Sequence, residues 1–223
     1  MAAQIQCGGA ATEPSVHNRA TGLLSGYVPF GPLWKGRLMT GNSQPWQARF
    51  PELFSDGYVD YADCHTRYTT DPVPERLVSR LHLVAVTPDG RVVVCRSEQG
   101  WRFLPGGTRE PGESLVELAR RELIEEAGAE LVGDPCLFSA HVADSRREQP
   151  FRPHLPHPRA YWAYATARVR LLGAPTNPVD GETVVEVLAV SPGAAAEYLD
   201  QYDQVHADVL RHATAMDLVK PWA

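Results

Sequence analysis

The most regular pattern in the chain is a series of short runs rich in Val, Leu and Ala that starts near residue 81. Two such runs, Leu81 to Val86 and Val92 to Arg96, flank the tetrapeptide Thr87-Pro88-Asp89-Gly90, whose residue types favour a turn. This order predicts a β-hairpin. Similar runs predict strands at Cys136 to Val142, Tyr161 to Leu171 and Thr183 to Val190, and helical patterns follow at Ala194 to Tyr198 and Val205 to Leu218.

A helix is predicted over Ser114 to Ala127. Ser114 and Glu117 form a capping-box pair, and Gly128 stands where a left-handed C-cap glycine belongs. On a helical wheel, an apolar arc is formed by Leu115, Val116, Ala119, Leu123 and Ala127, and Glu117, Arg120 and Ile124 lie on the other side. The apolar arc is therefore the expected buried face.

Three further glutamates of this helix occupy unusual positions. Glu126 projects inside the apolar arc, and Glu122 and Glu125 lie within it or beside its edge. A glutamate-rich helix is usually a solvated surface, but these positions contradict that interpretation. Carboxylates crowded at a buried margin repel one another, and they are costly to bury unless a cation or a proton compensates them. A hard divalent cation with oxygen ligands is the simplest compensation.

The loop before the helix is rich in glycine, with Gly106, Gly107 and Gly112. Glycine allows tight loop geometry and close backbone approach, so a main-chain carbonyl can join the carboxylates around a metal. The segment Gly107 to Ala129 resembles the Nudix box. All of its fixed positions are present: Gly107, Glu113, Arg121, Glu122, Leu123, Glu125, Glu126, Gly128 and Ala129.

The resemblance implies an α+β fold of the Nudix type, an α/β/α sandwich with a mixed sheet, here with an N-terminal extension. It implies that Glu122, Glu125, Glu126 and the carbonyl of Gly106 hold Mg²⁺, with Mn²⁺ as a substitute, while Arg121 pairs with Glu113 and orients the carboxylates. The implied reaction is metal-assisted attack of water on a phosphoanhydride of a nucleoside diphosphate derivative. ADP-ribose-like compounds, sugar nucleotides and modified nucleoside triphosphates are the expected substrates.

Family members often place one more carboxylate, as a base or an extra ligand, on a loop downstream of the box. Glu182 and Asp180 are the first candidates here, and Asp144 and Glu148 are the alternatives. Each of the four is equally compatible with a solvated loop acid. Substrate contacts are expected at Gly107, Arg96 and Trp101, and for the latter two packing and surface roles stay open.

A proline-rich segment, His154 to Arg159, precedes Tyr161 and Trp162. It is compatible with a substrate loop that has an aromatic wall, or with a zinc-binding histidine pair. The flanking prolines favour a third interpretation, a rigid solvent-exposed loop.

Charge and cysteine usage narrow the possible partners. With a net charge of −6, the chain has no long-range attraction for nucleic-acid polymers or anionic lipid, so a small nucleotide derivative is the expected partner. No apolar run approaches a membrane span and no signal peptide stands at the start, so a cytoplasmic protein is expected. The cysteines should be reduced, with Cys95 and Cys136 in core strands. Homodimerisation is common among proteins with this box and is a further expectation.

Three regions are predicted: an N-terminal extension over 1–74, a Nudix domain over 75–192 and a C-terminal helical segment over 193–223. The extension is rich in aromatic residues, which argues against a fully disordered tail, so beyond the first twenty or so residues it should be ordered and packed on the domain. One alternative is that residues 1–74 bind a partner, with the enzyme domain as cargo, although no specific motif indicates this. The other is a Nudix-like sensor that binds a nucleotide without turnover. Such modules commonly lose box carboxylates, and this chain keeps them all.

Overall fold

The computed structural model describes residues 44–177 and 183–223, and these residues belong to one compact unit. The strands are β1 (Gly57–Val59), β2 (Cys64–Thr69), β3 (Val78–Val86), β4 (Val92–Ser97), β5 (Arg102–Phe103), β6 (Gly106–Thr108), β7 (Ala129–Ser145), β8 (Arg159–Leu171) and β9 (Val184–Val190). The helices are α1 (Gln44–Arg49), α2 (Leu115–Ala127), α3 (Pro192–Asp200) and α4 (Gln204–Ala215).

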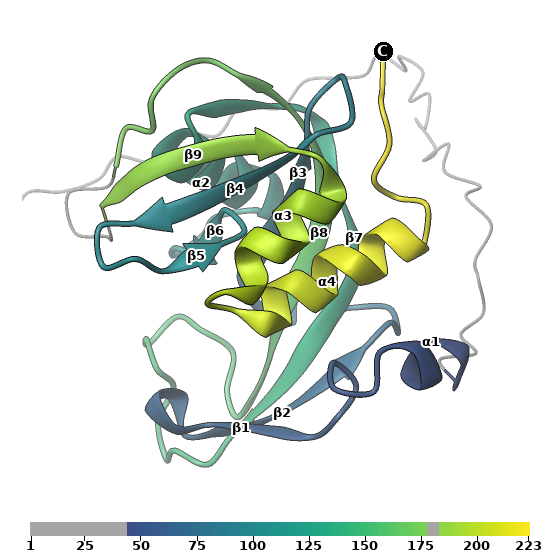
Figure 1. Cartoon of the computed structure of the whole chain (residues 1–223). Helices are drawn as coiled ribbons and strands as arrows, with labels where there is room; N and C mark the ends of the chain where they lie inside the picture. The colour runs from purple at the N-terminus through teal and green to yellow at the C-terminus, as the bar shows by residue number, and fades with distance from the viewer. Residues whose placement is uncertain (1–43, 178–182) are drawn as a thin grey trace, which may run out of the picture. The chain divides into compact units, whose positions relative to one another are not determined.

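All the described strands join one mixed sheet (Figure 1). Its main order is β1-β2-β7-β8-β3-β4-β5, while β6 pairs with β3 and β9 pairs with β4. The β3–β8 pair is parallel, and the other pairs are antiparallel. The predicted hairpin is confirmed, because β3 and β4 are antiparallel neighbours joined by a turn in which Gly90 has a φ of 80°.

Alternate residues of each central strand enter two different cores. On β3, Leu83 and Ala85 belong to the core beneath α2, whereas Val84 and Val86 belong to the core beneath α3 and α4. This alternation follows from the two-residue period of a strand. The sheet is therefore covered on both faces, by α2 behind it and by α3 and α4 in front of it in Figure 1. The predicted fold class, a mixed sheet between helices, is confirmed.

Helix α2 has the predicted cap at each end. The Ser114 side chain accepts from the Glu117 N–H and the Glu117 side chain accepts from the Ser114 N–H, while Gly128 is left-handed with a φ of 57°. The predicted buried face was partly wrong, since Leu118 is fully buried and Val116 is only half-buried. A helical wheel gives the relative directions of the side chains around the helix axis. The strands that pack against the helix decide which of these side chains are buried.

Strand β7 is much longer than predicted and is irregular near its start. Its pairing with β8 shifts register between Val132 and Cys136 and again between Leu137 and Ser139. Such irregularities re-aim side chains, and Cys136 is consequently exposed, so its predicted core position was wrong. Cys95 is fully buried, as predicted.

The described part of the N-terminal extension adds α1, β1 and β2 to the unit. Strand β2 pairs with the end of β7, with Thr66 opposite Ala143. Aromatic residues that follow the start of α1 pack around His212 of α4, with ring-centroid distances of 5.0 Å for Trp46 and 5.4 Å for Phe50. Predictions that concern residues 1–43 lie outside the described residues. Within the described ranges, no helix is long and apolar enough to cross a membrane.

Candidate active site

The guanidinium group of Arg121 donates hydrogen bonds to three carboxylates, one before α2 and two on it. Its Nε and Nη2 donate to the two oxygens of Glu113, at 2.8 and 3.1 Å, in a bidentate pair. Its Nη1 donates to Glu122 at 2.8 Å and to Glu125 at 3.2 Å, and Nη2 also donates to the Thr108 carbonyl at 3.1 Å. One planar group therefore joins the helix, the preceding loop and β6, which suits the rigid fork of arginine.

Two glycines let the glutamates approach the backbone of β6. The Gly106 N–H donates to Glu126 Oε2 at 2.8 Å, and a Cβ on Gly106 would lie 2.1 Å from the Leu81 carbonyl oxygen. A Cβ on Gly107 would lie 2.2 Å from Glu122 Oε1. A side chain at Gly106 would collide with the backbone, whereas one at Gly107 would displace the carboxylate of Glu122.

Among the three glutamates at the box end of α2, Glu122 is the most enclosed, with only 6% of its surface exposed. The sequence pattern had placed Glu126 deepest, but Glu125 and Glu126 are both half-buried. Burial, together with the neighbouring carboxylates of Glu125 and Glu113, raises the pKa of Glu122 to about 7 against the lowering effect of Arg121. Glu122 is thus a buried carboxyl whose charged form is poorly compensated.

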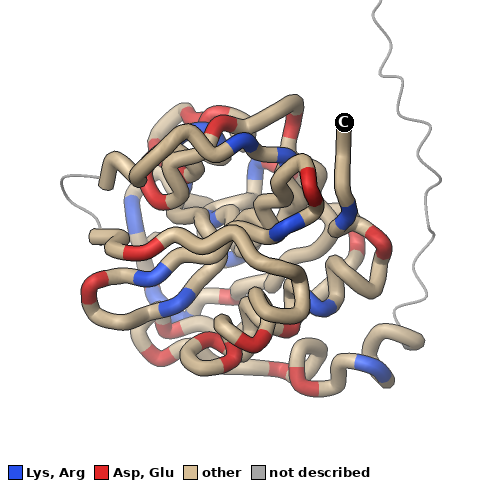
Figure 2. Tube along the Cα trace, turned by 45° about the horizontal axis from the view of Figure 1, so that its top comes forward, with Lys and Arg blue, Asp and Glu red and all other residues tan. Residues whose placement is uncertain are grey.

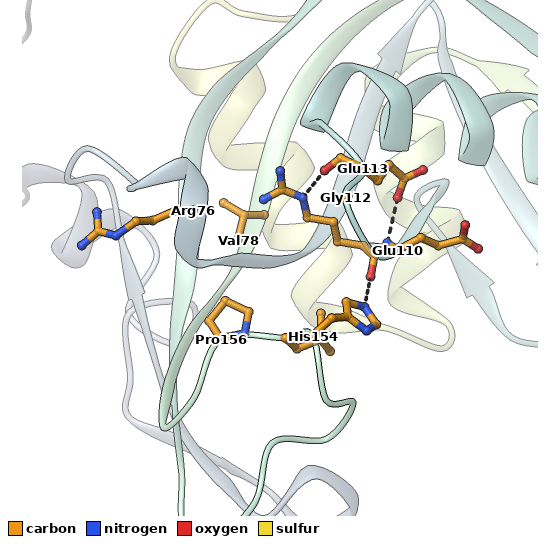
Figure 3. Close-up of a pocket in the computed structure, with 9 residues that line it drawn as sticks. Arg76, Val78, Glu110, Gly112, Glu113, His154 and Pro156 are labelled. Carbon is orange, nitrogen blue, oxygen red and sulfur yellow. Dashed lines mark hydrogen bonds between the residues drawn. The ribbon is translucent and has the colours of Figure 1, made fainter. Parts of the chain in front are cut away.

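The loop between β6 and α2 is held by its own side chains and by a distant loop. Arg109 Nε donates to the Glu113 carbonyl at 2.5 Å, and the Glu110 N–H donates to Glu113 Oε2 at 2.9 Å. His154 Nε2 contacts the Arg109 carbonyl at 2.9 Å. These groups border a hollow of about 180 Å³, which Arg76 also lines (Figure 3).

The donor set fits a hard divalent cation in chemistry. Four carboxylates, those of Glu113, Glu122, Glu125 and Glu126, lie around one guanidinium group and the β6 backbone, and oxygen ligands of this kind suit Mg²⁺. Elsewhere along the described trace, acidic and basic positions are interspersed (Figure 2). Within the described ranges no three His, Cys, Asp or Glu side chains already surround a common point. Glu122 and Glu125 both turn to Arg121 instead, so cation binding requires them to reorient.

Two other candidate substrate residues lie away from these carboxylates. Arg96 on β4 donates to Glu186 of β9 at 3.1 Å, and Tyr198 of α3 donates to the same carboxylate at 2.6 Å. Trp101 is 41% exposed, and its ring lies 6.2 Å from that of Tyr202 in the α3–α4 turn. The structure gives neither residue a contact with the Nudix-box carboxylates.

The candidates for the downstream carboxylate are also separated. Asp144 forms a bidentate pair with Arg159, at 2.6 and 2.9 Å, and Glu148 is exposed in the following loop. Asp180 and Glu182 lie outside the described residues. Asn177, which is described, donates its N–H to the Glu125 carbonyl at 3.0 Å, so Asn177 itself lies against α2.

Sequence reasoning missed three groups that support the candidate catalytic residues, two within the box segment and one from a distant loop. The Thr108 carbonyl, the Arg109 side chain and the His154 ring all act through contacts between positions that the one-dimensional pattern does not connect. The histidine-proline segment was the one available signal, since a loop next to substrate was among its interpretations.

Comparison with known proteins identifies the family of the chain. The model of the NUDIX domain family matches residues 76–213, more than half of the chain. The chain therefore belongs to the Nudix family. No curated protein matches the chain.

Several solved structures are similar to this chain at low sequence identity. A mutant of a Bacillus subtilis pyrophosphohydrolase shares 16% identity with a TM-score of 0.45, covering 60% of this chain and 75% of its own. A NUDIX hydrolase of Nitrosomonas europaea shares 16% at 0.44, with 64% and 93% covered. An ADP-ribose pyrophosphatase of Streptococcus suis shares 18% at 0.35, with 61% and 92% covered.

Proposed function

We propose that the chain is a magnesium-dependent hydrolase that cleaves a phosphoanhydride bond in a nucleoside diphosphate linked to another group. The observation that carries this proposal is the position of Glu122. It is almost fully buried, its pKa is raised to about 7, and two more α2 glutamates stand beside it. Membership of the Nudix family supports the same chemistry.

The residues divide into those that would hold the cation and those that position them. Glu122, Glu125 and Glu126 would hold Mg²⁺ together with the Gly106 carbonyl, and Arg121 and Glu113 fix the direction of the carboxylates. When bound, Mg²⁺ supplies positive charge to the diphosphate oxygens and lowers the pKa of water.

Glu126→Gln tests the role of the carboxylates. Glutamine keeps an oxygen for the Gly106 N–H and removes the charge, so magnesium-dependent hydrolysis should fall by about 100-fold or more while the unfolding transition stays nearly unchanged. Glu197→Gln, an exposed glutamate on α3, is the matched control and should retain full activity. An unchanged rate in Glu126→Gln would contradict the proposal.

The substrate class requires a panel of ADP-ribose-like, sugar-nucleotide and modified triphosphate compounds, each assayed with Mg²⁺ and with chelator. Hydrolysis of at least one compound, lost with chelator and restored by Mg²⁺ or Mn²⁺, is the expected result. Tight binding of one compound with no turnover of any would instead identify a sensor.

A further inference from the structure

A second hollow lies where the N-terminal extension meets the sheet, and we call it the extension cleft. Its walls include Cys64 of β2, Arg80 of β3, Trp162 of β8, and Arg147, Phe151 and Pro156 of the loop after β7. None of the α2 glutamates lines it. Leu155 and Pro156 border both this cleft and the hollow beside Glu113, so the two spaces are neighbours.

Two arginines of the extension cleft are held by neutral partners. Arg80 Nη1 donates to the Tyr61 hydroxyl at 2.9 Å, and its guanidinium group lies 5.0 Å from the Trp162 ring centre. Arg147 donates to the carbonyls of Tyr61 and Ala62, at 2.6 and 3.2 Å. Within 44–177 and 183–223, neither arginine forms an ion pair. Their positions are thus fixed without their charge being neutralised.

The charge of both arginines reaches the interior of the extension cleft. Burial raises the pKa of the Cys64 thiol, and Arg80 and Arg147 both act to lower it, so both guanidinium groups lie near this wall. Asp63 and Asp144 act on the same thiol pKa in the opposite sense, and both have other partners: Asp63 accepts from Tyr58 and Asp144 pairs with Arg159. An anion that entered the cleft would meet two guanidinium groups that are oriented by neutral partners and form no ion pair within the described ranges.

The extension cleft has a volume of about 60 Å³, room for a few water-sized groups, and it is open to solvent. It can therefore receive a small anionic group, free or at the end of a larger ligand. A phosphate group, with one phosphorus and four oxygens, is such a group, and planar guanidinium groups bind phosphate through paired hydrogen bonds. We propose that the extension cleft binds a phosphate group through Arg80 and Arg147.

The test measures binding of inorganic phosphate to the full chain by calorimetry, at constant ionic strength and without Mg²⁺. Arg80→Gln and Arg147→Gln should each weaken binding at least about tenfold, because each removes hydrogen bonds to a charged group. Arg152→Gln, in the same loop but outside the cleft, is the matched control and should stay within about twofold of the wild type. No phosphate uptake by the wild type, or equal weakening in Arg152→Gln, would overturn the proposal.

Arg147 also ties the loop to the extension, so its loss can disturb folding. Arg147→Lys keeps the charge and should bind phosphate better than Arg147→Gln at an equal unfolding midpoint. Equal binding by the two variants would show that Arg147 acts only structurally and would count against the site. Because this measurement needs no hydrolysis, its result is independent of the proposed enzyme activity.

Kinetics then separate the two sources of the phosphate. If it belongs to the substrate, Arg80→Gln should raise KM for a nucleoside triphosphate with little change in kcat, and should leave KM for ADP-ribose unchanged. If free phosphate is the ligand, both KM values should stay unchanged while the calorimetric affinity falls. Either pattern supports the proposal that the extension cleft binds phosphate. A fall in kcat alone, with normal phosphate binding, would overturn this proposal.

Discussion

The two faces of the sheet are packed in contrasting ways. The face under α2 is built from apolar side chains, many of them alanines, and its buried charge is confined to the rim at Glu122. The face under α3 and α4 also buries histidines, namely His141, His206 and His212. On that face the Tyr68 hydroxyl donates to Ser139 at 2.6 Å and contacts His212 Nδ1 at 2.8 Å.

The difference separates two tasks. Small side chains such as Ala163 and Ala165 let α2 pack close to the sheet. The charged groups of α2 then lie at the edge of this apolar core. On the opposite face, buried polar groups satisfy one another and connect β2 of the extension to α4 near the C-terminus. One face thus positions the candidate chemistry, and the other joins distant parts of the chain.

The largest effect is expected at the turn that meets α2. In Gly106→Ala the new Cβ would lie 2.1 Å from the Leu81 carbonyl oxygen, and Gly106 has a φ of 148°. We expect a loss of about 4 kcal/mol or more in unfolding free energy. Urea denaturation of the variant and of Gly173→Ala, where the Cβ meets nothing within 4 Å, provides the measurement and its control.

In contrast to Gly106→Ala, Gly107→Ala should affect activity more than stability. Its Cβ would meet the flexible end of Glu122, so stability should fall by only about 1 kcal/mol, whereas displacement of the carboxylate should lower hydrolysis by about 100-fold. Equal loss of stability in the two glycine variants would show that Glu122 does not move independently of the backbone.

The next effect compares one buried leucine from each face. Leu123→Ala under α2 and Leu210→Ala in α4 should each cost about 2–5 kcal/mol of stability. At a temperature where both variants stay folded, only Leu123→Ala should lose hydrolysis, because it loosens the helix that carries Glu122. An equal loss of kcat in Leu210→Ala would contradict the proposal that only the face under α2 positions the candidate catalytic residues.

The pH dependence of stability should also differ between the faces. Burial lowers the pKa of His141, His206 and His212 from 6.5 to about 4, so the unfolded chain binds more protons and stability falls as pH drops from about 6.5 to about 4. Glu122 acts in the opposite sense, because its raised pKa favours the folded state at low pH and this contribution is lost as pH rises from about 4.5 to about 7.

Urea unfolding with chelator, near pH 5 and near pH 7, measures the net effect. Burial lowers the pKa of His82 to about 3 as well, and the four histidines together outweigh one carboxyl, so the wild type should be more stable near pH 7. His212→Phe should reduce the difference in unfolding free energy between pH 7 and pH 5 by at most a few kcal/mol. Glu122→Gln should enlarge the same difference. A wild type that is more stable near pH 5 would contradict this balance.

The smallest effect is expected from one hydroxyl group. Tyr68→Phe leaves Ser139 and His212 Nδ1 without their buried partner, which should cost about 1–3 kcal/mol. Tyr202→Phe, at a ring that is 53% exposed, should be nearly neutral when thermal midpoints are compared. Equal midpoints for Tyr68→Phe and the wild type would mean that this network contributes no net stability.

Local signals in the sequence were sufficient to predict the β3–β4 hairpin and both ends of α2, and to recognise the Nudix-box residues. Turn chemistry, capping and strand or helix periods act over a few residues, so they can be recognised without knowledge of what packs against them. The same signals predicted that glutamates are crowded at a buried margin.

Only the tertiary structure decided that Glu122 is the buried carboxylate, that the register shifts in β7 expose Cys136, and that β2 joins the sheet beside β7. It also placed Arg80 and Arg147 in one cleft, although they lie far apart in the sequence. Burial and charge compensation depend on which distant segments come together, and no local pattern in the chain contains that information.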